Sequence, residues 1–332
     1  MSKEIRKREE ITMTDYKKLV ELLKGHTVRI QMHNFPDPDA VASAFGLQFF
    51  LKKHDIDSTI CYDGHVDKIS VIKMFECFGV EAKEYRELDI KEEDYVVLVD
   101  GQKLNSNVTD IAGEEVACID HHPTFKECEY SYKDVRIVGA CSSIIADYLK
   151  QSNTTPDKMV ASALYYGIKM DTQSLSRGLT KLDIQMYEYL FDYADIELVE
   201  SMYNNNMELS DLTAYGAAIQ NINIYDNVAI ARIPFECEDA LIAMVSDFVM
   251  KLDLVTVAII YAEKKGGLKF SVRSETEKVH AGYLVENALK GIGNGGGHQS
   301  MAGGYIDAGN RNEDIVSEDY TITERFLTAL KN

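Results

Sequence analysis

The chain of 332 residues has no tryptophan, only five prolines and no long hydrophobic run. No apolar stretch approaches the roughly 20 residues that cross a bilayer, and the charged start, MSKEIRKREE, lacks the apolar segment of a signal peptide. The six cysteines include no C-x-x-C pair, which favours buried free thiols in a reducing compartment over a thiolate zinc site. We therefore expect a cytoplasmic protein with no membrane partner.

Positive charge is also scarce. Lysine and arginine number 35 against 54 aspartates and glutamates, for a formal net charge of -19. This balance argues against a broad basic surface that grips long DNA or RNA. It leaves room for a phosphate substrate held by a few local cations or by metal ions. The length predicts two domains, and the hydrophobic content of 45% is that of a globular protein.

Short apolar runs alternate with helical patterns in the first half of the chain. Residues 28–32, 95–99 and 116–119 predict strands, and residues 40–51 and 71–78 predict helices. Alternating strands and helices favour an α/β fold, with an N-terminal parallel sheet flanked by helices. The residues before this sheet read as a polar lead-in followed by one amphipathic helix.

The second half has a different order of strand and helix patterns, and it predicts a smaller mixed α/β domain. Strand patterns cover 227–233, 254–261 and 268–274, a helical pattern covers 279–289, and 291–304 reads as a glycine-rich loop. We expect the following division: a catalytic domain with its helical lead-in over 1–185, a linker over 186–210, and a substrate-binding domain over 211–332.

Acidic residues and histidines follow the predicted strands of the first domain, where ligands gather in α/β sheets. His33, Asp37 and Asp39 lie in one turn stiffened by two prolines. The alternative is that Asp39 caps the following helix and Asp37 is only solvated. Asp100 ends another strand, and Asp171 follows a helical pattern. Asp100 alone would also suit an ordinary turn before a glycine.

The sequence Asp120-His121-His122 follows a third strand. Adjacent residues of an extended chain point to opposite sides, so we expect different roles for the two histidines. Together these segments offer four candidate carboxylate ligands and two or three candidate imidazole ligands. Carboxylate with imidazole suits Mn²⁺ or a related divalent ion. So many crowded anionic groups would be costly without cations, and metal ions are the simplest compensation.

Four segments, HNFPDPDA, VLVDG, IDHHP and GIKMDT, resemble in this order the four motifs of the DHH phosphoesterase superfamily. Further along, SVRS and GNGGGHQSMAGG resemble the DHH-associated substrate-binding domain of the nano-RNase and RecJ-like branch. The inorganic pyrophosphatases of the superfamily carry a different C-terminal domain without this glycine segment. One departure is Ala42, which stands where the family usually has glycine.

The resemblance implies two divalent ions with Asp100 as a shared ligand and a bridging water as the nucleophile. The implied ligands are His33, Asp37 and Asp100 for one ion, and Asp39, Asp100, His121 and Asp171 for the other. Asp120 would orient the imidazoles. His122 would be a hydrogen-bond donor or general acid at the phosphoryl group, or else a packed, hydrogen-bonded histidine.

The resemblance also implies a phosphate grip in the second domain. Glycines let backbone amides approach an anion, and an arginine can hold a phosphate with two hydrogen bonds. The implied substrate-binding residues are Arg273, Ser274, Gly295, Gly296, Gly297 and His298. In the first domain, Ser143 is either a cap at the start of a helix or a further substrate contact.

The function that these residues favour is a Mn²⁺-dependent phosphodiesterase for short oligoribonucleotides, linear dinucleotides or 3′-phosphoadenosine nucleotides. Short substrates are favoured because a nuclease for long single strands needs a basic, aromatic-lined groove. A cyclic dinucleotide phosphodiesterase is the alternative in the same class. A non-catalytic nucleotide-binding regulator is a third reading, but it predicts the loss of a ligand, and all six ligand positions are filled. A homodimer is compatible with each reading.

Overall fold

The computed structural model describes residues 15–66, 68–205, 207–311 and 314–331. Contacts divide the chain into two compact units, Met1–Asn206 and Met207–Asn332. The predicted polar lead-in over residues 1–14 lies outside the described residues. The amphipathic helix that follows it is α1 (Tyr16–Leu23), which buries Leu19 and Leu23. No helix in the described segments is both long and apolar enough to cross a membrane.

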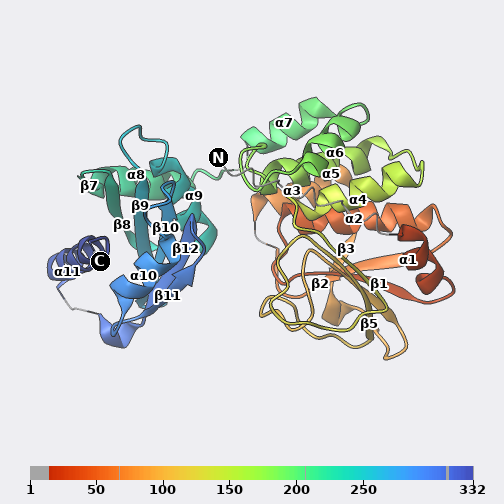
Figure 1. Ribbon diagram of the computed structural model, residues 1–332, viewed down its shortest axis with the longest axis horizontal. Coiled ribbons are helices and arrows are strands. Elements are labelled where there is room, and N and C mark those ends of the chain that lie inside the picture. The colour runs from red at the N-terminus through yellow and green to blue at the C-terminus, as the bar shows by residue number, and fades with distance from the viewer. Residues whose placement is uncertain (1–14, 67, 206, 312–313, 332) are drawn as a thin grey trace, which may run out of the picture. The chain divides into compact units, whose positions relative to one another are not determined.

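Unit 1 is built on a six-stranded sheet in which every neighbouring pair is parallel (Figure 1). Its strands are β1 (Val28–Met32), β2 (Ser58–Tyr62), β3 (Ala82–Glu84), β4 (Tyr95–Val99), β5 (Glu114–Asp120) and β6 (Tyr132–Val135). Their order is β3-β2-β1-β4-β5-β6, which reverses direction between β1 and β4. The predicted parallel α/β sheet is confirmed, and in open sheets the carboxyl ends of the strands at such a reversal, here β1 and β4, are the usual place for a ligand.

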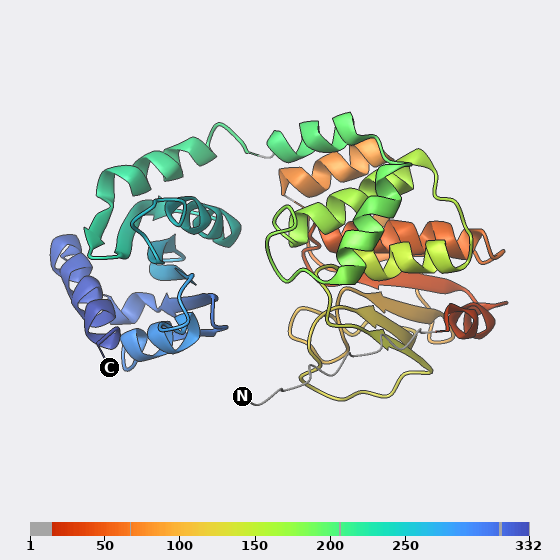
Figure 2. The same ribbon diagram turned by 45° about the horizontal axis from the view of Figure 1, so that its top comes forward.

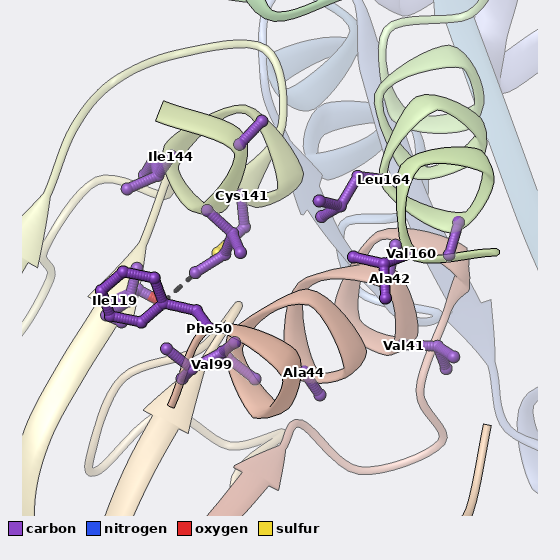
Figure 3. Close-up of a cluster of buried hydrophobic side chains, with 14 of the residues drawn as sticks. Val41, Ala42, Ala44, Phe50, Val99, Ile119, Cys141, Ile144, Val160 and Leu164 are labelled. Atoms are coloured by element: carbon purple, nitrogen blue, oxygen red, sulfur yellow. Dashed lines mark hydrogen bonds between the residues drawn. The ribbon is translucent and has the colours of Figure 1, made fainter. Parts of the chain in front are cut away.

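The α-helices of unit 1 gather on one face of this sheet (Figure 2). They include α2 (Pro38–Lys52), α3 (Ile69–Phe78), α4 (Cys141–Gln151), α5 (Lys158–Asp171), α6 (Lys181–Phe191) and α7 (Ile196–Asn204). Helix α2 lies in the middle of the core, beside strand residues such as Val99 and Ile119 and helix residues such as Leu164 (Figure 3). A Cβ on Gly46 would lie 2.8 Å from the Leu164 side chain, so glycine lets α2 and α5 pack closely.

The opposite face of the sheet carries a smaller apolar cluster. Cys61, Val96, Leu98 and Ile111 form it, and residues such as Tyr85 in the short 3-10 helix η1 (Tyr85–Glu87) cover it. The sheet is therefore closed by helices on one side and mainly by loops on the other.

The segment 186–210, which the sequence predicts as a linker, contains the end of α6 and all of α7. Helix α7 buries Val199 and Met202 at helical spacing, and both belong to the core of unit 1. An apolar helix face of this kind requires a packing partner, so most of this segment is part of unit 1. The assignment of the units as catalytic and substrate-binding domains stays a prediction.

Unit 2 is the smaller mixed α/β body that the sequence predicts. Its sheet has the order β11-β12-β10-β9-β8-β7, with β8 and β9 parallel and the other pairs antiparallel. The strands are β7 (Asn223–Tyr225), β8 (Val228–Glu236), β9 (Val257–Lys264), β10 (Gly267–Ser274), β11 (Asn294–Gly297) and β12 (Met301–Ile306). The helices are α8 (Asp211–Asn221), α9 (Asp239–Val249), α10 (Ala281–Leu289), the 3-10 helix η2 (Ala308–Asn310) and α11 (Ile315–Ala329).

The glycine-rich segment is not the loop predicted from the sequence. Gly295, Gly296 and Gly297 form strand β11, which pairs with β12 in a hairpin. The glycines are explained in part by close packing against α10. A Cβ on Gly282 would collide with the carbonyl oxygen of Gly297, and a Cβ on Gly295 would lie 2.9 Å from Val285. Gly296 is different, since a Cβ there would meet nothing within 4 Å.

Candidate metal centre

The predicted ligands converge at the carboxyl edge of the six-stranded parallel sheet of unit 1, where the strand order reverses. His33 follows β1, Asp100 follows β4 and His121 follows β5. Asp39 lies in the first turn of α2, and Asp171 is the last residue of α5. Edges of this kind are the usual ligand sites of open parallel sheets. The topology alone therefore brings together residues that are far apart in sequence.

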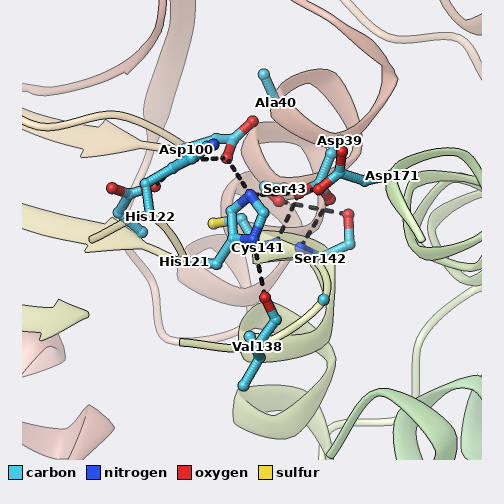
Figure 4. Close-up of polar contacts among 12 residues, drawn as sticks. Asp39, Ala40, Ser43, Asp100, His121, His122, Val138, Cys141, Ser142 and Asp171 are labelled. Carbon is cyan, nitrogen blue, oxygen red and sulfur yellow. Dashed lines mark hydrogen bonds and ion pairs between the residues drawn. The ribbon is translucent and has the colours of Figure 1, made fainter. Parts of the chain in front are cut away.

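Asp100 contacts two of the predicted histidine ligands, and Figure 4 shows it beside His121, with Asp39 and Asp171 on the other side of that ring. Its Oδ2 lies 3.7 Å from His33 Nε2, and its Oδ1 lies 3.3 Å from His121 Nε2. The residue is 2% exposed, Oδ1 has no hydrogen-bond partner, and the backbone has φ of +55°. A buried carboxylate oxygen without a donor and a left-handed backbone are both unfavourable, and such features concentrate at functional sites. This orphaned oxygen fits a cation.

Three groups of ligand atoms have the spacing that a metal ion requires, because the donor atoms within each group all lie within 4.8 Å of one another. Two of them, His33 with Asp37 and Asp100, and Asp39 with His121 and Asp171, fit the two predicted ligand sets. The third is Asp100 with His121 and His122. Each set combines imidazole with carboxylate, a combination that suits Mn²⁺ and related divalent ions. Because Asp100 contacts both histidines, it is placed to serve both sets.

The carboxylates at the start of α2 are held in place by backbone amides. Asp37 caps α2, since its Oδ1 accepts hydrogen bonds from Asp39 N at 3.0 Å and Ala40 N at 3.1 Å. The alternative in which Asp39 is this cap is therefore wrong. Asp39 instead accepts from Cys141 N at 2.6 Å and Ser142 N at 2.9 Å, at the positive end of α4. Two helix starts thus fix two candidate ligands.

The histidines are oriented by carbonyl groups. His33 Nδ1 donates to Asn34 O at 2.9 Å, and His121 Nδ1 donates to Val138 O at 3.1 Å. Each bond leaves Nε2 facing the carboxylates, the arrangement that is common for metal-binding histidines.

The charges of this cluster shift its pKa values strongly. Burial lowers the pKa of His33, but Asp37 and Asp100 outweigh it and raise the pKa to about 9. Burial likewise opposes protonation of His121, yet the negative charges of the nearby Asp100, Asp39 and Asp171 carboxylates raise its pKa to about 11. Burial raises the pKa of Asp171 to about 6. Without ions, the site therefore holds protons tightly, as a set of crowded anions must.

His122 is held differently from His121. The chain leaves β5 at Asp120, so the two rings do not point to opposite sides as the extended-strand argument predicts. Their centroids are 4.1 Å apart, and His122 Nδ1 lies 3.7 Å from Asp100 Oδ1. His122 Nδ1 donates to Asp120 Oδ1 at 2.9 Å, and this bond raises the pKa of His122. Asp120 therefore orients His122, whereas Val138 orients His121.

Gln102 is a site residue that the sequence analysis missed. Its Nε2 donates to Asp120 Oδ2 at 2.7 Å and to the carbonyl oxygen of His122 at 3.0 Å, and the side chain is buried. Asp120 thus has one oxygen for His122 and one for Gln102. The only signal in the sequence is that Gln102 lies two positions after Asp100, and no pattern assigns a glutamine there.

Arg177 is a second missed residue. Its Nη2 donates to the Asp171 carbonyl oxygen at 2.8 Å and to Asp171 Oδ1 at 3.2 Å. The other oxygen, Oδ2, lies 3.3 Å from His121 Nε2. Arg177 therefore turns the Asp171 carboxylate so that one oxygen faces the cluster. Arginine near an acidic helix end is too common a pattern to predict this role.

Three of the predicted substrate contacts form hydrogen bonds with groups of the protein itself. Ser143 is fully buried and its hydroxyl donates to Asp183 Oδ1 at 2.6 Å, so it faces the interior of unit 1 instead of a substrate, and it does not cap α4. In unit 2 the Ser274 hydroxyl donates to Val279 O at 2.8 Å. Arg273 Nε donates to Asp247 Oδ1 at 2.6 Å.

His298 is exposed at the turn of the glycine hairpin. Together with the open position at Gly296, it is the part of the predicted grip that is free to meet a ligand.

Comparisons with known proteins agree with both halves of the chain. Residues 27–168 match the DHH family, N-terminal domain, and residues 226–319 match the DHHA1 domain. An uncharacterized protein of Methanocaldococcus jannaschii is 26% identical over 282 residues, which cover 84% of this chain and 58% of that protein. A Streptococcus mutans protein named "Probable bifunctional oligoribonuclease and PAP phosphatase NrnA" is 28% identical over 331 residues, covering 92% of this chain and 98% of that protein.

A solved structure supports the fold over the whole chain. The crystal structure of an exopolyphosphatase-related protein from Bacteroides fragilis matches with a TM-score of 0.76, covering 97% of this chain and 99% of that chain at 17% identity. The two domain matches, in the order that the motifs predict, show that this chain belongs to the DHH phosphoesterase superfamily, as a metal-dependent phosphoesterase with a DHH-associated C-terminal domain.

Proposed function

We propose that this phosphoesterase hydrolyses short linear nucleotides: oligoribonucleotides of a few residues, linear dinucleotides and 3′-phosphoadenosine nucleotides. The observation that carries the proposal is the buried Asp100 carboxylate, which lies between two imidazole–carboxylate sets and whose Oδ1 has no hydrogen-bond partner. The relative from S. mutans, whose name refers to both oligoribonuclease and PAP phosphatase activity, supports this substrate class. The net charge of -19 supports short substrates over long ones.

In this proposal two divalent ions, with Mn²⁺ as the best suited, share Asp100. His33 and Asp37 complete one ligand set, and Asp39, His121 and Asp171 complete the other. Such ions, when bound, neutralise phosphate charge and acidify a water molecule. The chain's own contribution is to hold Asp37 and Asp39 by backbone amides and Asp171 by Arg177, so that little reorganisation is needed when substrate arrives.

His122 is the proposed proton donor. Its ring is 51% exposed, and the hydrogen bond to Asp120 occupies Nδ1, so Nε2 is free to meet a leaving oxygen. The same bond raises the pKa of His122 and favours the protonated form that a general acid needs. In unit 2 we propose that Arg273, His298 and the amides around Gly296 hold a terminal phosphate. For Arg273 this requires exchange of its bond to Asp247.

A substrate screen tests the proposal. Purified protein with Mn²⁺ would be assayed on a linear dinucleotide, 3′-phosphoadenosine 5′-phosphate, a cyclic dinucleotide, a longer oligonucleotide and pyrophosphate. We expect kcat/KM for the first two to exceed the values for the longer oligonucleotide and pyrophosphate by at least about tenfold, because a long strand needs a basic groove that a net charge of -19 does not favour and pyrophosphate lacks a nucleoside that contributes binding energy. Asp100→Asn is the inactive control. A clear preference for pyrophosphate, for the long strand or for the cyclic dinucleotide would contradict the proposal.

A further inference from the structure

Phe35 lies between two proposed metal ligands and has an unusual conformation. It is two residues from both His33 and Asp37, so its Cα lies within about 7 Å of each of theirs. Its φ is +53°, a left-handed backbone that is rare for a bulky residue, and its side chain is 52% exposed. An aromatic ring held in solvent by a strained backbone requires an explanation other than packing in the core.

The backbone around Phe35 is tied down on both sides. Phe35 N donates to Asp63 O at 3.0 Å, and Asn34 N donates to Asn107 O at 2.6 Å. The Asn34 side chain also exchanges two hydrogen bonds with Thr109, at 3.0 and 3.1 Å. These bonds keep the turn fixed, so the ring has a defined position beside the ligand cluster.

The ring itself has a firm support. A Cβ on Gly64 would lie 2.7 Å from the Phe35 ring, so only glycine lets the ring lie this close to the backbone. The His65 ring meets Phe35 edge-on, with centroids 5.2 Å apart and planes at 85°. One part of the ring is therefore packed against backbone and imidazole, and the remainder is free to contact a ligand.

Other exposed apolar side chains follow the strands that end at this edge. Leu104 comes after β4, Phe125 after β5 and Ile137 after β6. The carboxyl ends of parallel strands meet at one edge of a sheet, so a charged centre is accompanied by apolar groups on the neighbouring loops. Phosphate alone uses only the charged part. Small-molecule sites with both features take ligands that carry an apolar part and a few polar groups.

We infer that Phe35 is a stacking platform for the nucleobase next to the phosphate that lies at the ligand cluster. Aromatic side chains stack on any base because every base has a flat π-face, and this contact is independent of sequence. The inference rests on the proposed function and deepens it: Phe35 would make the site prefer nucleotides over inorganic phosphate esters. It predicts selectivity for the presence of a base and little selectivity among bases.

The test compares Phe35→Leu, which keeps an apolar side chain but removes the flat ring, with Phe35→Tyr, which keeps the ring. Phe191→Leu is the matched control, since Phe191 is 55% exposed at the end of α6. Substrates are a linear dinucleotide and its abasic analogue, in which both bases are absent. For Phe35→Leu we expect KM for the dinucleotide to rise roughly tenfold to a hundredfold, with kcat changed less than about threefold. On the abasic analogue, Phe35→Leu and wild type should have the same KM. On the dinucleotide, Phe35→Tyr, which keeps the stacking ring, and Phe191→Leu should both keep the wild-type KM.

Two results would overturn the inference: an unchanged KM of Phe35→Leu for the dinucleotide, or an equal rise for the abasic analogue. Titration calorimetry with the dinucleotide in Ca²⁺, which also binds carboxylate sites, measures the contribution of the base without turnover. A wild type that binds the dinucleotide more tightly than the abasic analogue, but hydrolyses neither, would refute the proposed function and leave the stacking role supported.

Discussion

The metal-free protein should lose stability as the pH rises from about 6.5 to about 9. The carboxylates of Asp37 and Asp100 overcome the effect of burial and raise the pKa of His33 from 6.5 to about 9. The folded state therefore holds this proton more tightly than the unfolded state does. The resulting stabilisation is complete below the unfolded pKa and disappears as the pH passes the folded one.

The size of the effect follows from the pKa. Each tenfold change in proton affinity corresponds to about 1.4 kcal/mol, so His33 contributes roughly 3 kcal/mol to the free energy of unfolding at low pH and almost nothing above pH of about 9. His121 and Asp171, whose pKa values rise to about 11 and about 6, act in the same direction. Bound divalent ions require deprotonated ligands, so their stabilising effect grows over the same range.

Urea unfolding followed by circular dichroism measures this. Wild type and His33→Asn would be compared in a chelator at pH of about 6 and about 9. Wild type should lose about 2–3 kcal/mol more than His33→Asn between these values, and saturating Mn²⁺ should remove the loss. Equal losses in wild type and variant would refute the reasoning, because the tight proton would then not belong to His33.

Three further predictions concern single residues. Asparagine tolerates the left-handed backbone of residue 100, so Asp100→Asn should keep the melting temperature within a few degrees of wild type while lowering kcat about a thousandfold or more at saturating Mn²⁺. Turnover within tenfold of wild type would remove Asp100 from the mechanism. Gln102→Leu should lower kcat about tenfold through a loosened His122 and leave Mn²⁺ affinity, measured by calorimetry, unchanged; a loss of Mn²⁺ affinity would show that Gln102 supports the ligands instead. Arg273→Ala should lower kcat/KM for a linear dinucleotide roughly tenfold to a hundredfold, with little effect on bis-p-nitrophenyl phosphate; equal losses would mean that Arg273 serves chemistry or folding.

The ligand residues were predictable from the sequence because each follows a local signal. Apolar runs end at Met32, Val99 and Ile119, and the acidic or histidine residues come directly after them. Since parallel strands share one edge, the local signals also implied that these residues converge. The structure brings the predicted residues together at this edge, and it places His122 beside Asp100 and His121 as well; the choice of six metal ligands stays a prediction from the family resemblance.

The supporting residues were not predictable in the same way. Gln102 and Arg177 act through single side-chain hydrogen bonds that depend on the tertiary structure, and neither lies in a distinctive pattern. The glycine segment was predicted as a loop because glycines favour turns. Its strand depends on the close approach of α10, which a local pattern cannot reveal. Helix α7 was also not predictable from a local pattern, because its apolar face is recognised as part of unit 1 only when the core that it packs against is known.

The wide separation of the ligands along the chain has a consequence for folding kinetics. The candidate centre draws on residues from His33 to Asp171, and it is complete only when β1, β4, β5 and α5 have all assembled. Long-range parallel pairing of this kind forms slowly. An ion that binds only the finished site cannot speed the search for it, and stabilises the native state after the rate-limiting step. Mn²⁺ should therefore slow unfolding and leave the refolding rate nearly unchanged, so that the loaded protein persists longer without forming sooner.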